Sequence, residues 1–221
     1  MSKGETTRQA ILEKALAMSS VVGLEGISIG RLADDLALSK SGLFAHFRSK
    51  EALQLQVLES AAQHFVDDVV RPALKEPRGE PRLRALFDRW LAWARSQELP
   101  GGCIFVSATM EMDDRPGPVR DALARYQSDW INVLATATRA GVDSGAFRGD
   151  LEPEQFAQEA YGLMLSYHLF ARLLRDPEGE ARARVGFDAL VRRAIGPAQP
   201  SPSTAAHKAG RARTRSTRTA K

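Results

Sequence analysis

The sequence has a single cysteine, Cys103, and no apolar run long enough to cross a membrane. One cysteine excludes a disulfide within the chain and is typical of a protein from a reducing compartment. A membrane-spanning helix needs about 20 consecutive apolar residues, and this chain has no such stretch. The N-terminal residues MSKGETTRQ also lack the apolar core of a secretory signal. We therefore expect a cytoplasmic protein that contacts no membrane.

The usual catalytic and metal-binding motifs are missing as well. The sequence has no Gly-rich phosphate loop, no Gly-x-Ser-x-Gly elbow and no His-x-x-x-His pair, and its four histidines lie far apart. Glu111, Asp113 and Asp114 are close in sequence but have no histidine near them, so we interpret them as a solvated turn. These features argue against an enzyme, a metal site and a bound cofactor.

Acidic residues are absent from the C-terminal tail, and this decides what the net charge of +4 means. From Pro197 onward the chain has six Lys and Arg residues and no Asp or Glu. Without those six, 25 basic residues face 27 acidic ones, so the rest of the chain is not basic. The tail is rich in Pro, Ser, Thr and Ala, and we expect residues 197–221 to be disordered. Its charges either add sequence-independent attraction to DNA or only keep the chain soluble.

The rest of the chain consists of amphipathic segments with helical spacing, separated by breaks rich in Gly and Pro. Segment 103–112 is apolar enough to be a strand or a buried helix, but predicted helices on both sides favour a helix. We predict an all-α fold of about nine helices. Two are short and lie within 28–50; the others lie near 7–22, 50–70 (ended by Pro72), 82–97, 103–112, 119–140, 153–175 and 179–195.

The stretch from Ser28 to Lys50 is predicted to form two short helices joined by a tight turn at Ala37 and Leu38. Ser28 and Ser39 are candidate N-caps, because a serine hydroxyl accepts a free backbone N–H of the first helical turn. The apolar residues of the first helix share one face at i, i+3, i+4, i+7 spacing: Ile29, Leu32, Ala33 and Leu36.

The second short helix turns Leu43 and Phe47 inward. A helix this short needs neighbours to hold it, and its outward residues are Lys40, Ser41, Phe44 and His46. Within 37–50 there are three basic residues, one histidine and no acidic residue. Small, polar and basic side chains on a free helix face are what a helix in the DNA major groove needs.

This stretch and the helix before it resemble the tetracycline-repressor (TetR) family of bacterial transcription regulators over about residues 7–59. The resemblance rests on the order Ser-x-x-Gly-x-aromatic-x-His-Phe, followed by a lysine, at Ser39, Gly42, Phe44, His46, Phe47 and Lys50. Segment 100–119 also looks like one found in some members. The sequence departs from the family pattern at Phe44, where a tyrosine is usual and commonly hydrogen bonds to a phosphate.

The resemblance implies a helical fold, usually of nine helices, and a homodimer that binds a palindromic operator in double-stranded DNA. It also implies release of the operator when a small-molecule effector enters the C-terminal domain. We accordingly assign residues 1–50 to a helix-turn-helix DNA-binding domain and residues 51–196 to a ligand-binding and dimerisation domain. The remaining residues, 197–221, form the basic tail.

The candidate DNA contacts come from the helix-turn-helix and the residues around it. Lys40 and Lys50 are the strongest, and Lys50 lies in a helical first turn whose free N–H groups also favour a phosphate. The serines act either as caps or as phosphate donors, Gly42 either allows close approach or merely needs no side chain, and His46 either meets a phosphate or packs on Phe47. Phe44 is a candidate for a thymine methyl or sugar contact. The full set is Ser28, Arg31, Ser39, Lys40, Ser41, Gly42, Phe44, His46 and Lys50.

Aromatic and methionine residues in the C-terminal part form either ordinary core or an apolar cavity with few polar anchors. The ligand candidates are Phe87, Trp90, Trp93, Phe105, Met110, Tyr126, Trp130, Met164, Tyr167 and His168. His168 is alternatively a hydrogen-bonded core or interface histidine. Cys103 is either a redox sensor or inert.

The predicted helix at 153–175 is apolar on more than one side, so we expect it to be covered twice, once by its own chain and once by a partner. With the last helix it gives the predicted dimer interface: Phe156, Ala160, Leu163, Tyr167, Phe170, Phe187, Leu190, Val191 and Ala194. The sequence thus predicts a dimeric repressor released from its operator by a small, largely apolar ligand. The alternative is a DNA-binding regulator without a ligand, controlled by its abundance or by a protein partner.

Overall fold

The computed structural model describes residues 3–196, and over that range it contains helices and no β-strand. The helices are α1 (Lys3–Val22), α2 (Ile29–Asp35), α3 (Lys40–Phe47), α4 (Lys50–Phe65), the π-helical segment η1 (Val66–Val70), α5 (Arg71–Ala73), α6 (Glu80–Ala94), α7 (Ile104–Met112), α8 (Pro118–Asp143), α9 (Pro153–Arg172) and α10 (Gly179–Ile195). Because α4, η1 and α5 run on without a break, they form one rod, and the described part has nine helices in this sense. The predicted all-α fold is confirmed, whereas the disorder predicted for 197–221 concerns residues outside the described range.

Serine caps begin the helices at the N-terminal end of the molecule. The hydroxyl of Ser28 accepts the N–H of Arg31 at 3.2 Å, and that of Ser39 accepts the N–H of Gly42 at 3.0 Å. Ser49 caps α4 in the same way, through the N–H of Ala52 at 3.0 Å. Each cap satisfies an otherwise free donor and contributes about 1 kcal/mol. The caps predicted at Ser28 and Ser39 are confirmed.

The prediction that Pro72 ends the fourth helix is wrong, because the rod continues to Ala73. Proline has no N–H, so in a regular helix the carbonyl of Asp68 would lose its donor. Here the guanidinium of Arg89 donates to that carbonyl at 3.4 Å. The preceding η1 segment also changes the pattern, since the N–H of Arg71 donates to the carbonyl of Val66, five residues back. The helical rod therefore continues past Pro72.

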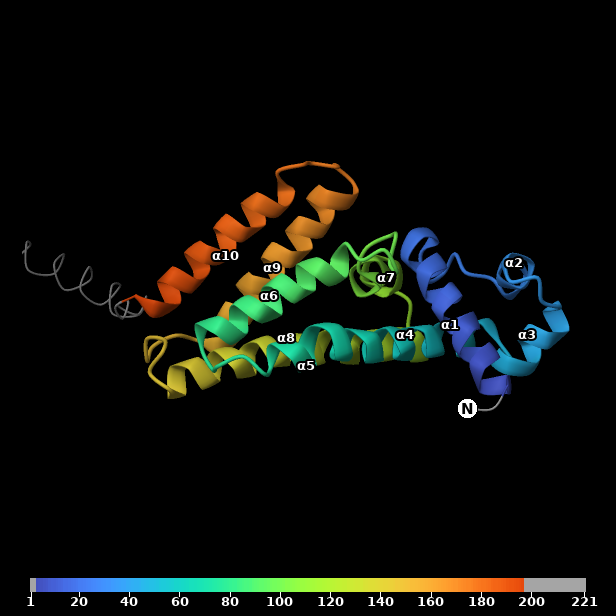
Figure 1. Ribbon diagram of the computed structural model, residues 1–221, viewed down its shortest axis with the longest axis horizontal. Helices are drawn as coiled ribbons and strands as arrows, with labels where there is room; N and C mark the ends of the chain where they lie inside the picture. Colours follow the sequence, from blue (N-terminus) through green and yellow to red (C-terminus); the bar gives the residue numbers. More distant parts are fainter. Residues whose placement is uncertain (1–2, 197–221) are drawn as a thin grey trace, which may run out of the picture.

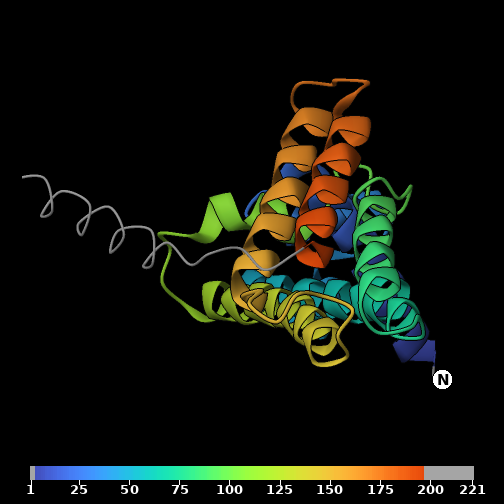
Figure 2. The same cartoon turned by 90° about the vertical axis from the view of Figure 1, so that its left-hand side faces the viewer.

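The helices form an elongated molecule with α1, α2 and α3 at one end (Figure 1). The α4–η1–α5 rod and α8 run along its length and contact each other, and α7 packs against both α1 and α8. Helices α9 and α10 form a pair that stands on α8 and α6 (Figure 2). The described chain ends at Gly196, at the end of the molecule opposite α2 and α3 (Figure 1).

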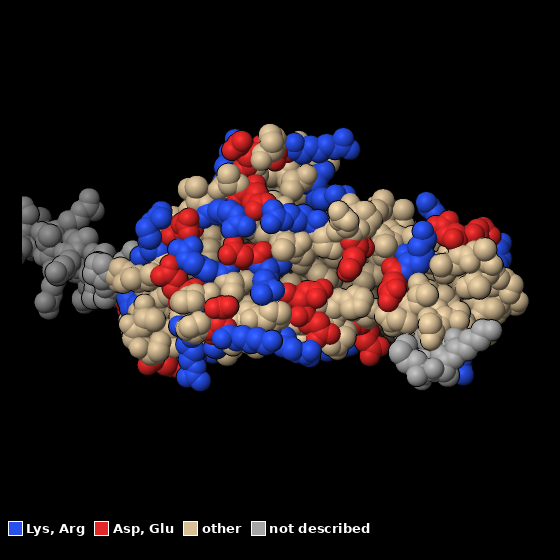
Figure 3. Space-filling model, in the orientation of Figure 1, with Lys and Arg blue, Asp and Glu red and all other residues tan. Residues whose placement is uncertain are grey.

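Charged side chains of both signs are interleaved over the face formed by α6 and α10 (Figure 3). Arg84 pairs with Asp188, and Arg184 pairs with Asp88 across the same two helices. Such exposed pairs stabilise a fold weakly. The apolar core beneath them runs from Ile11 in α1 to Ala194 in α10. Among the described residues, no helix combines the length and apolarity that crossing a membrane requires.

Candidate DNA-binding surface and ligand cavity

The helix-turn-helix is held by its buried residues. Leu43 and Phe47 of α3 are buried, as predicted, and α3 packs against α2 and the start of α4. Between α2 and α3 the chain turns at Ala37, which has a left-handed backbone with φ of 52°. These few buried side chains fix the angle at which α3 is presented to solvent.

The outer face of α3 is exposed. Lys40, Ser41 and Gly42 are open to solvent, and the ring of Phe44 is 51% exposed. His46 is half-buried, with its ring centre 6.1 Å from that of Phe47. The structure thus brings the α3 candidates together on one surface.

The remaining DNA candidates lie at the edge of this surface. Ser28 and Arg31 are exposed at the start of α2. The Ser39 hydroxyl, besides capping α3, lies 3.2 Å from the Ser41 hydroxyl. Lys40 lies alongside Gly30, where an added Cβ would be 3.5 Å from its Cε atom. Lys40 has no ion-pair partner among the residues the structure describes.

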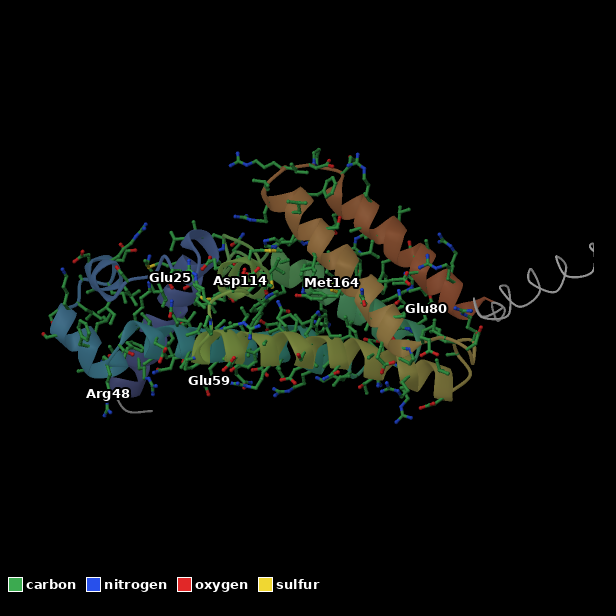
Figure 4. The ribbon with its side chains drawn as sticks, turned by 180° about the vertical axis from the view of Figure 1, so that it is seen from behind. Glu25, Arg48, Glu59, Glu80, Asp114 and Met164 are labelled. Atoms are coloured by element: carbon green, nitrogen blue, oxygen red, sulfur yellow. The ribbon has the colours of Figure 1, made fainter. Side chains whose placement is uncertain are left out.

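Lys50 is in a different situation. Its ammonium donates to the backbone carbonyl of Glu25 at 2.5 Å and to the Glu25 carboxylate at 2.7 Å. This hydrogen bond is the main reason that the pKa of Glu25 is below its usual value. Glu25 lies beside the turn that carries Asp114 (Figure 4). The predicted DNA contact at Lys50 is therefore occupied by another residue of the same chain.

The N-terminal helices are fastened to the rest of the molecule by the loop before α7. The Ser20 hydroxyl, at the end of α1, accepts the N–H of Gly101 at 2.9 Å. A side chain at Gly101 would not fit, because its Cβ would lie 1.5 Å from the backbone oxygen of Ser20. The two backbones therefore meet directly at this point.

A cavity of about 320 Å³ lies between the rod and helices α6, α7, α8 and α9. Four of the ten predicted ligand residues line it: Trp90, Phe105, Tyr126 and Trp130. The lining residues that the sequence analysis did not propose are Glu59, Ala62, Gln63, Phe65, Val66, Val70, Cys103, Gln127, Asp129, Val133 and Tyr161. Most of these come from the rod, whose sequence looks like that of an ordinary packed helix.

Phe65, the last residue of α4, organises the aromatic wall of the cavity. Its ring meets the rings of Trp93, Phe105 and Trp130 edge to face, with centroid separations of 5.5, 6.0 and 5.0 Å. This geometry aligns a ring edge with a ring face and is favourable for aromatic pairs. The wall is therefore built by long-range packing of four elements.

Two polar side chains of the cavity, Gln127 and Tyr161, are already hydrogen bonded, whereas the buried indole N–H of Trp130 has no partner among the described residues. The Gln127 amide donates to the carbonyl of Phe105 at 3.0 Å and to the Thr109 hydroxyl at 2.8 Å. The Tyr161 hydroxyl in turn donates to the Gln127 carbonyl oxygen at 2.6 Å. Burial raises the pKa of Tyr161 well above its usual value. Burial also raises the pKa of the Cys103 thiol, which favours its weakly nucleophilic protonated form.

The charges at the cavity are negative. Glu59 and Asp129 are exposed on α4 and α8, and no Lys, Arg or His lines the cavity. Glu59 lies on the part of α4 that runs beside α8 (Figure 4). Tyr126 lies in the field of these carboxylates, and its pKa is raised by burial first and by Glu59 second. Arg125 acts on Tyr126 in the opposite direction but does not line the cavity.

Six predicted ligand residues lie elsewhere. Phe87 stacks on Phe187 of α10, with ring centres 4.0 Å apart, and Trp93 packs behind Phe65. Tyr167 packs against Trp90, and Met164 is completely buried. Met110 is 75% exposed because it lies on the outer side of α7. His168 is half-buried against Gly102, and burial lowers its pKa.

The residues predicted for the dimer interface mostly lie inside the protomer. Helices α9 and α10 pack on each other and on α6 and α8, so their most apolar sides cover one another. The buried residues are Phe156, Ala160, Tyr167, Phe187, Leu190, Val191 and Ala194, and Leu163 and Phe170 are half-buried. The apolar residues that these helices and their ends leave exposed are instead Leu169, Leu173, Leu174, Val185 and Ile195. Most of the predicted interface residues are therefore covered by the protomer itself, and only Leu163 and Phe170 among them are partly open to solvent.

Two family models match most of the chain. One, described as "Bacterial regulatory proteins, tetR family", matches residues 11–57, and the other, "Tetracyclin repressor-like, C-terminal domain", matches residues 79–187. The first covers the helix-turn-helix, and the second covers much of the cavity wall. Among the residues described here, no group of three or more His, Cys, Asp or Glu is placed to hold a metal ion.

Curated relatives and solved structures agree with these matches. The chain is 28% identical over 153 residues to the transcriptional repressor DhaR of Mycobacterium sp. strain GP1, covering 68% of this chain and 74% of DhaR. It is 26% identical over 176 residues to the repressor NemR of Escherichia coli K12, covering 78% of this chain and 87% of NemR. Its fold is similar to that of a TetR regulator from Chloroflexus aurantiacus, with a TM-score of 0.77, 24% identity and coverage of 86% and 95% of the two chains. It is also similar to reduced E. coli NemR, with a TM-score of 0.71, 24% identity and coverage of 84% and 95%.

Helices α2 and α3 form a capped helix-turn-helix, and α3 is its exposed recognition helix. Together with the all-helical body, this unit defines a DNA-binding regulator of transcription. It is a regulatory protein and not an enzyme. The two matching models belong to one family and together cover more than half of the sequence. The chain belongs to the tetracycline-repressor (TetR) family.

Proposed function

We propose that the chain is a homodimeric repressor that binds a palindromic operator through α3 and leaves it when a small, largely apolar molecule fills the cavity. In this proposal residues 1–50 bind DNA and residues 51–196 bind the effector and form the dimer. DhaR and NemR, which are named transcriptional repressors, support this direction of control. A solved structure of similar fold, that of AibR, contains both isovaleryl coenzyme A and operator DNA.

The observation that carries the proposal is the continuity of the α4–η1–α5 rod. The rod begins at Lys50, with only Arg48 and Ser49 between it and the end of α3, and it lines the cavity at Phe65, Val66 and Val70. A molecule that moves this wall acts on the same helix against which α3 packs. The cavity and the DNA-binding surface thus share one rigid element.

Ligand control requires two states that differ in operator affinity. In a dimer, the two recognition helices must fit successive major grooves, about 34–36 Å apart. We propose that the occupied cavity favours a state with a different separation. The ligand must bind the two states unequally, because equal affinity would shift nothing.

The chemistry of the cavity limits the effector. Its wall is mainly aromatic and aliphatic, and the internal polar groups of Gln127 and Tyr161 are paired with each other. Only carboxylates, Glu59 and Asp129, are charged at its edge. An anionic ligand is therefore disfavoured, and the proposal is a neutral or positively charged apolar molecule.

The proposed dimer face uses the exposed side of α9 and α10. Leu169, Leu173 and Val185 are apolar and open to solvent, and Gly162 on α9 leaves room for a close approach. Burial of such residues by a second copy would remove apolar surface from water. Sedimentation of the wild type and of Leu169→Lys tests this face, and a variant that remains dimeric contradicts it.

The experiment begins with selection of DNA fragments by the purified protein, followed by a thermal-shift screen of small molecules. We expect a compound that raises the melting temperature and weakens binding to the selected operator. Ala62→Leu, which adds bulk to the cavity wall, should lose the response to the compound but keep operator binding. Ala92→Leu on the exposed side of α6 is the matched control. Compounds that bind in the cavity without changing operator affinity would favour control by abundance or by a protein partner.

A further inference from the structure

Two lysines flank the helix-turn-helix surface, and their surroundings differ. Lys40, at the start of α3, has no ion-pair partner among the residues described. Lys50, at the start of α4, directs its ammonium at two oxygens of Glu25, the backbone carbonyl and the carboxylate. Two oxygens around one ammonium resemble the environment that a DNA phosphate offers.

Glu25 is held in position from the α4 side. Gln54, one turn after Lys50, donates its amide to the carbonyl of Leu24 at 2.9 Å and to the Glu25 carboxylate at 3.3 Å. Gln54 is only 5% exposed, so it fixes the loop from within the core. The Glu25 carboxylate is therefore placed against Lys50 before any DNA is present.

The same loop is held from the α7 side. The Glu111 carboxylate accepts the backbone N–H of Glu25 at 2.9 Å, and the Arg115 guanidinium lies 3.6 Å from the Glu25 carboxylate. Gly23 makes room for this contact: it has φ of +81°, and a Cβ there would lie 1.9 Å from a Glu111 oxygen. Helix α7, which ends near Glu111, carries the cavity residue Phe105 in its first turn.

We propose that Glu25 stands in for a DNA phosphate at Lys50, so that Lys50 reaches the backbone of DNA only by exchanging Glu25 for a phosphate. The exchange is feasible because both side chains are partly exposed, at 40% and 46%, and ion pairs of this kind are weak. Phosphate contacts carry no base information. Glu25 is thus a positioning residue that lowers the affinity for all duplexes alike and leaves sequence preference unchanged.

This inference rests on the proposed binding of DNA by α3 and the start of α4. The test uses Glu25→Gln, Lys50→Ala and the double variant, with a random-sequence duplex of about 30 base pairs, and follows fluorescence anisotropy over a range of salt concentrations. Glutamine keeps the size and the hydrogen-bonding oxygen of Glu25 and removes only its charge. Glu25→Gln should bind about threefold to tenfold more tightly because no ion pair has to be exchanged, and its salt slope should stay close to that of the wild type, since Lys50 meets a phosphate in both proteins. In the Lys50→Ala background it should give only the small gain that follows from removing any negative charge near DNA.

The matched control is Glu51→Gln, which removes the same charge next to Lys50 in sequence but from a side chain exposed on α4. It measures the general effect of deleting a negative charge near DNA, and we expect the same small gain with and without Lys50. Two results overturn the inference: Glu25→Gln tightens binding equally in both backgrounds, or it weakens binding while Lys50 is present. Either result would show that Glu25 does not compete with phosphate for Lys50.

A measurement on the wild-type protein does not depend on the folding of any variant. The groups around the Glu25 carboxylate are Lys50 and Gln54 on α4 and Glu111 and Arg115 beside α7. Duplex binding removes Lys50 and brings phosphates close, so the pKa of Glu25, followed by carbon NMR of its side chain, should rise on binding. An unchanged pKa overturns the inference.

Failure of the inference is distinguishable from failure of the proposed function. If Lys40→Ala weakens duplex binding and Lys50→Ala does not, the DNA-binding surface stands and the role of Glu25 is overturned. If neither lysine affects affinity or salt slope, the surface itself is wrong, and the inference falls with it.

Discussion

The recognition helix and the cavity wall each depend on a phenylalanine, and the two rings lie in opposite surroundings. Phe44 on α3 is 51% exposed, whereas Phe65 at the end of α4 is 8% exposed and meets three aromatic rings edge to face. A surface that binds another molecule exposes apolar area to water before binding, whereas a side chain that supports a cavity wall is covered by its own chain. The difference indicates that α3 is shaped for contact with a partner, while the rod is shaped for contact with its own chain.

The largest expected effect is on the free energy of unfolding, which should depend on Phe65 far more than on Phe44. Phe65→Ala should lower the free energy of unfolding by about 3–5 kcal/mol, because it deletes a buried ring and leaves a void. Phe44→Ala should change it by less than about 0.5 kcal/mol, since an exposed side chain loses little packing. Urea denaturation of both variants measures this. Similar losses for both would contradict the comparison.

The next effect concerns DNA affinity. Lys40→Ala removes a positive charge that no acidic residue of the described chain pairs with, so it should weaken operator binding about tenfold and reduce the salt slope by about 0.9. The melting temperature should stay unchanged, in contrast to Phe65→Ala. Fluorescence anisotropy at several salt concentrations provides the measurement, and an unaltered slope would remove Lys40 from the set of phosphate contacts.

A smaller effect is expected from the hydroxyl that Phe44 lacks. Phe44→Tyr adds a donor to an already exposed ring, and a hydrogen bond to a phosphate should tighten operator binding about threefold to tenfold. Because the contact would be to the backbone, scrambled duplexes should gain equally. A gain restricted to the operator would mean that residue 44 faces a base, and no gain would mean that its ring points away from the phosphates.

The smallest effect is a pH dependence of stability. Burial first and Arg172 second lower the pKa of His168 below the usual value of 6.5. The unfolded chain therefore takes up the proton more readily, so stability is highest above about pH 6.5 and declines as the pH falls from there toward the folded pKa. Melting temperatures between about pH 7.5 and 5.5 should fall less in His168→Gln than in the wild type. His46→Gln on α3 serves as the matched variant, and an identical decline in His168→Gln would exclude this histidine as the cause.

Local signals explain why the helix-turn-helix was predictable. The serine caps, the turn at Ala37 and the inward pair Leu43 and Phe47 act over a few residues each, so a sequence window of about 20 residues contains the whole unit. No sequence window of this length contains the residues that line the cavity. Phe65, Gln127 and Tyr161 line one cavity only after α4, α8 and α9 have packed, and each is an ordinary helical residue in its own segment.

The helix pair α9–α10 shows a different limit of sequence reasoning. Periodicity identified the helix at 153–175 as apolar on more than one side, but it does not tell which side meets the same chain. Phe187 became core because Phe87 of α6 and Phe156 of α9 pack against it, whereas Leu173 and Val185 remained exposed. Lys50 is a similar case, because Glu25, 25 residues away, was not visible as its partner.

The π-helical turn in the rod has a consequence for chain length. A single π turn accommodates one residue more than an α-helix of the same span, so removal of one residue between Val66 and Val70 restores regular hydrogen bonding and leaves both flanking helices in place. Phe65, Val66 and Val70 line the cavity, whereas Lys50 lies at the far end of the rod. A deletion at this turn would therefore reshape the cavity wall at Val66 and Val70 while the rod stays a continuous helix from the cavity to α3.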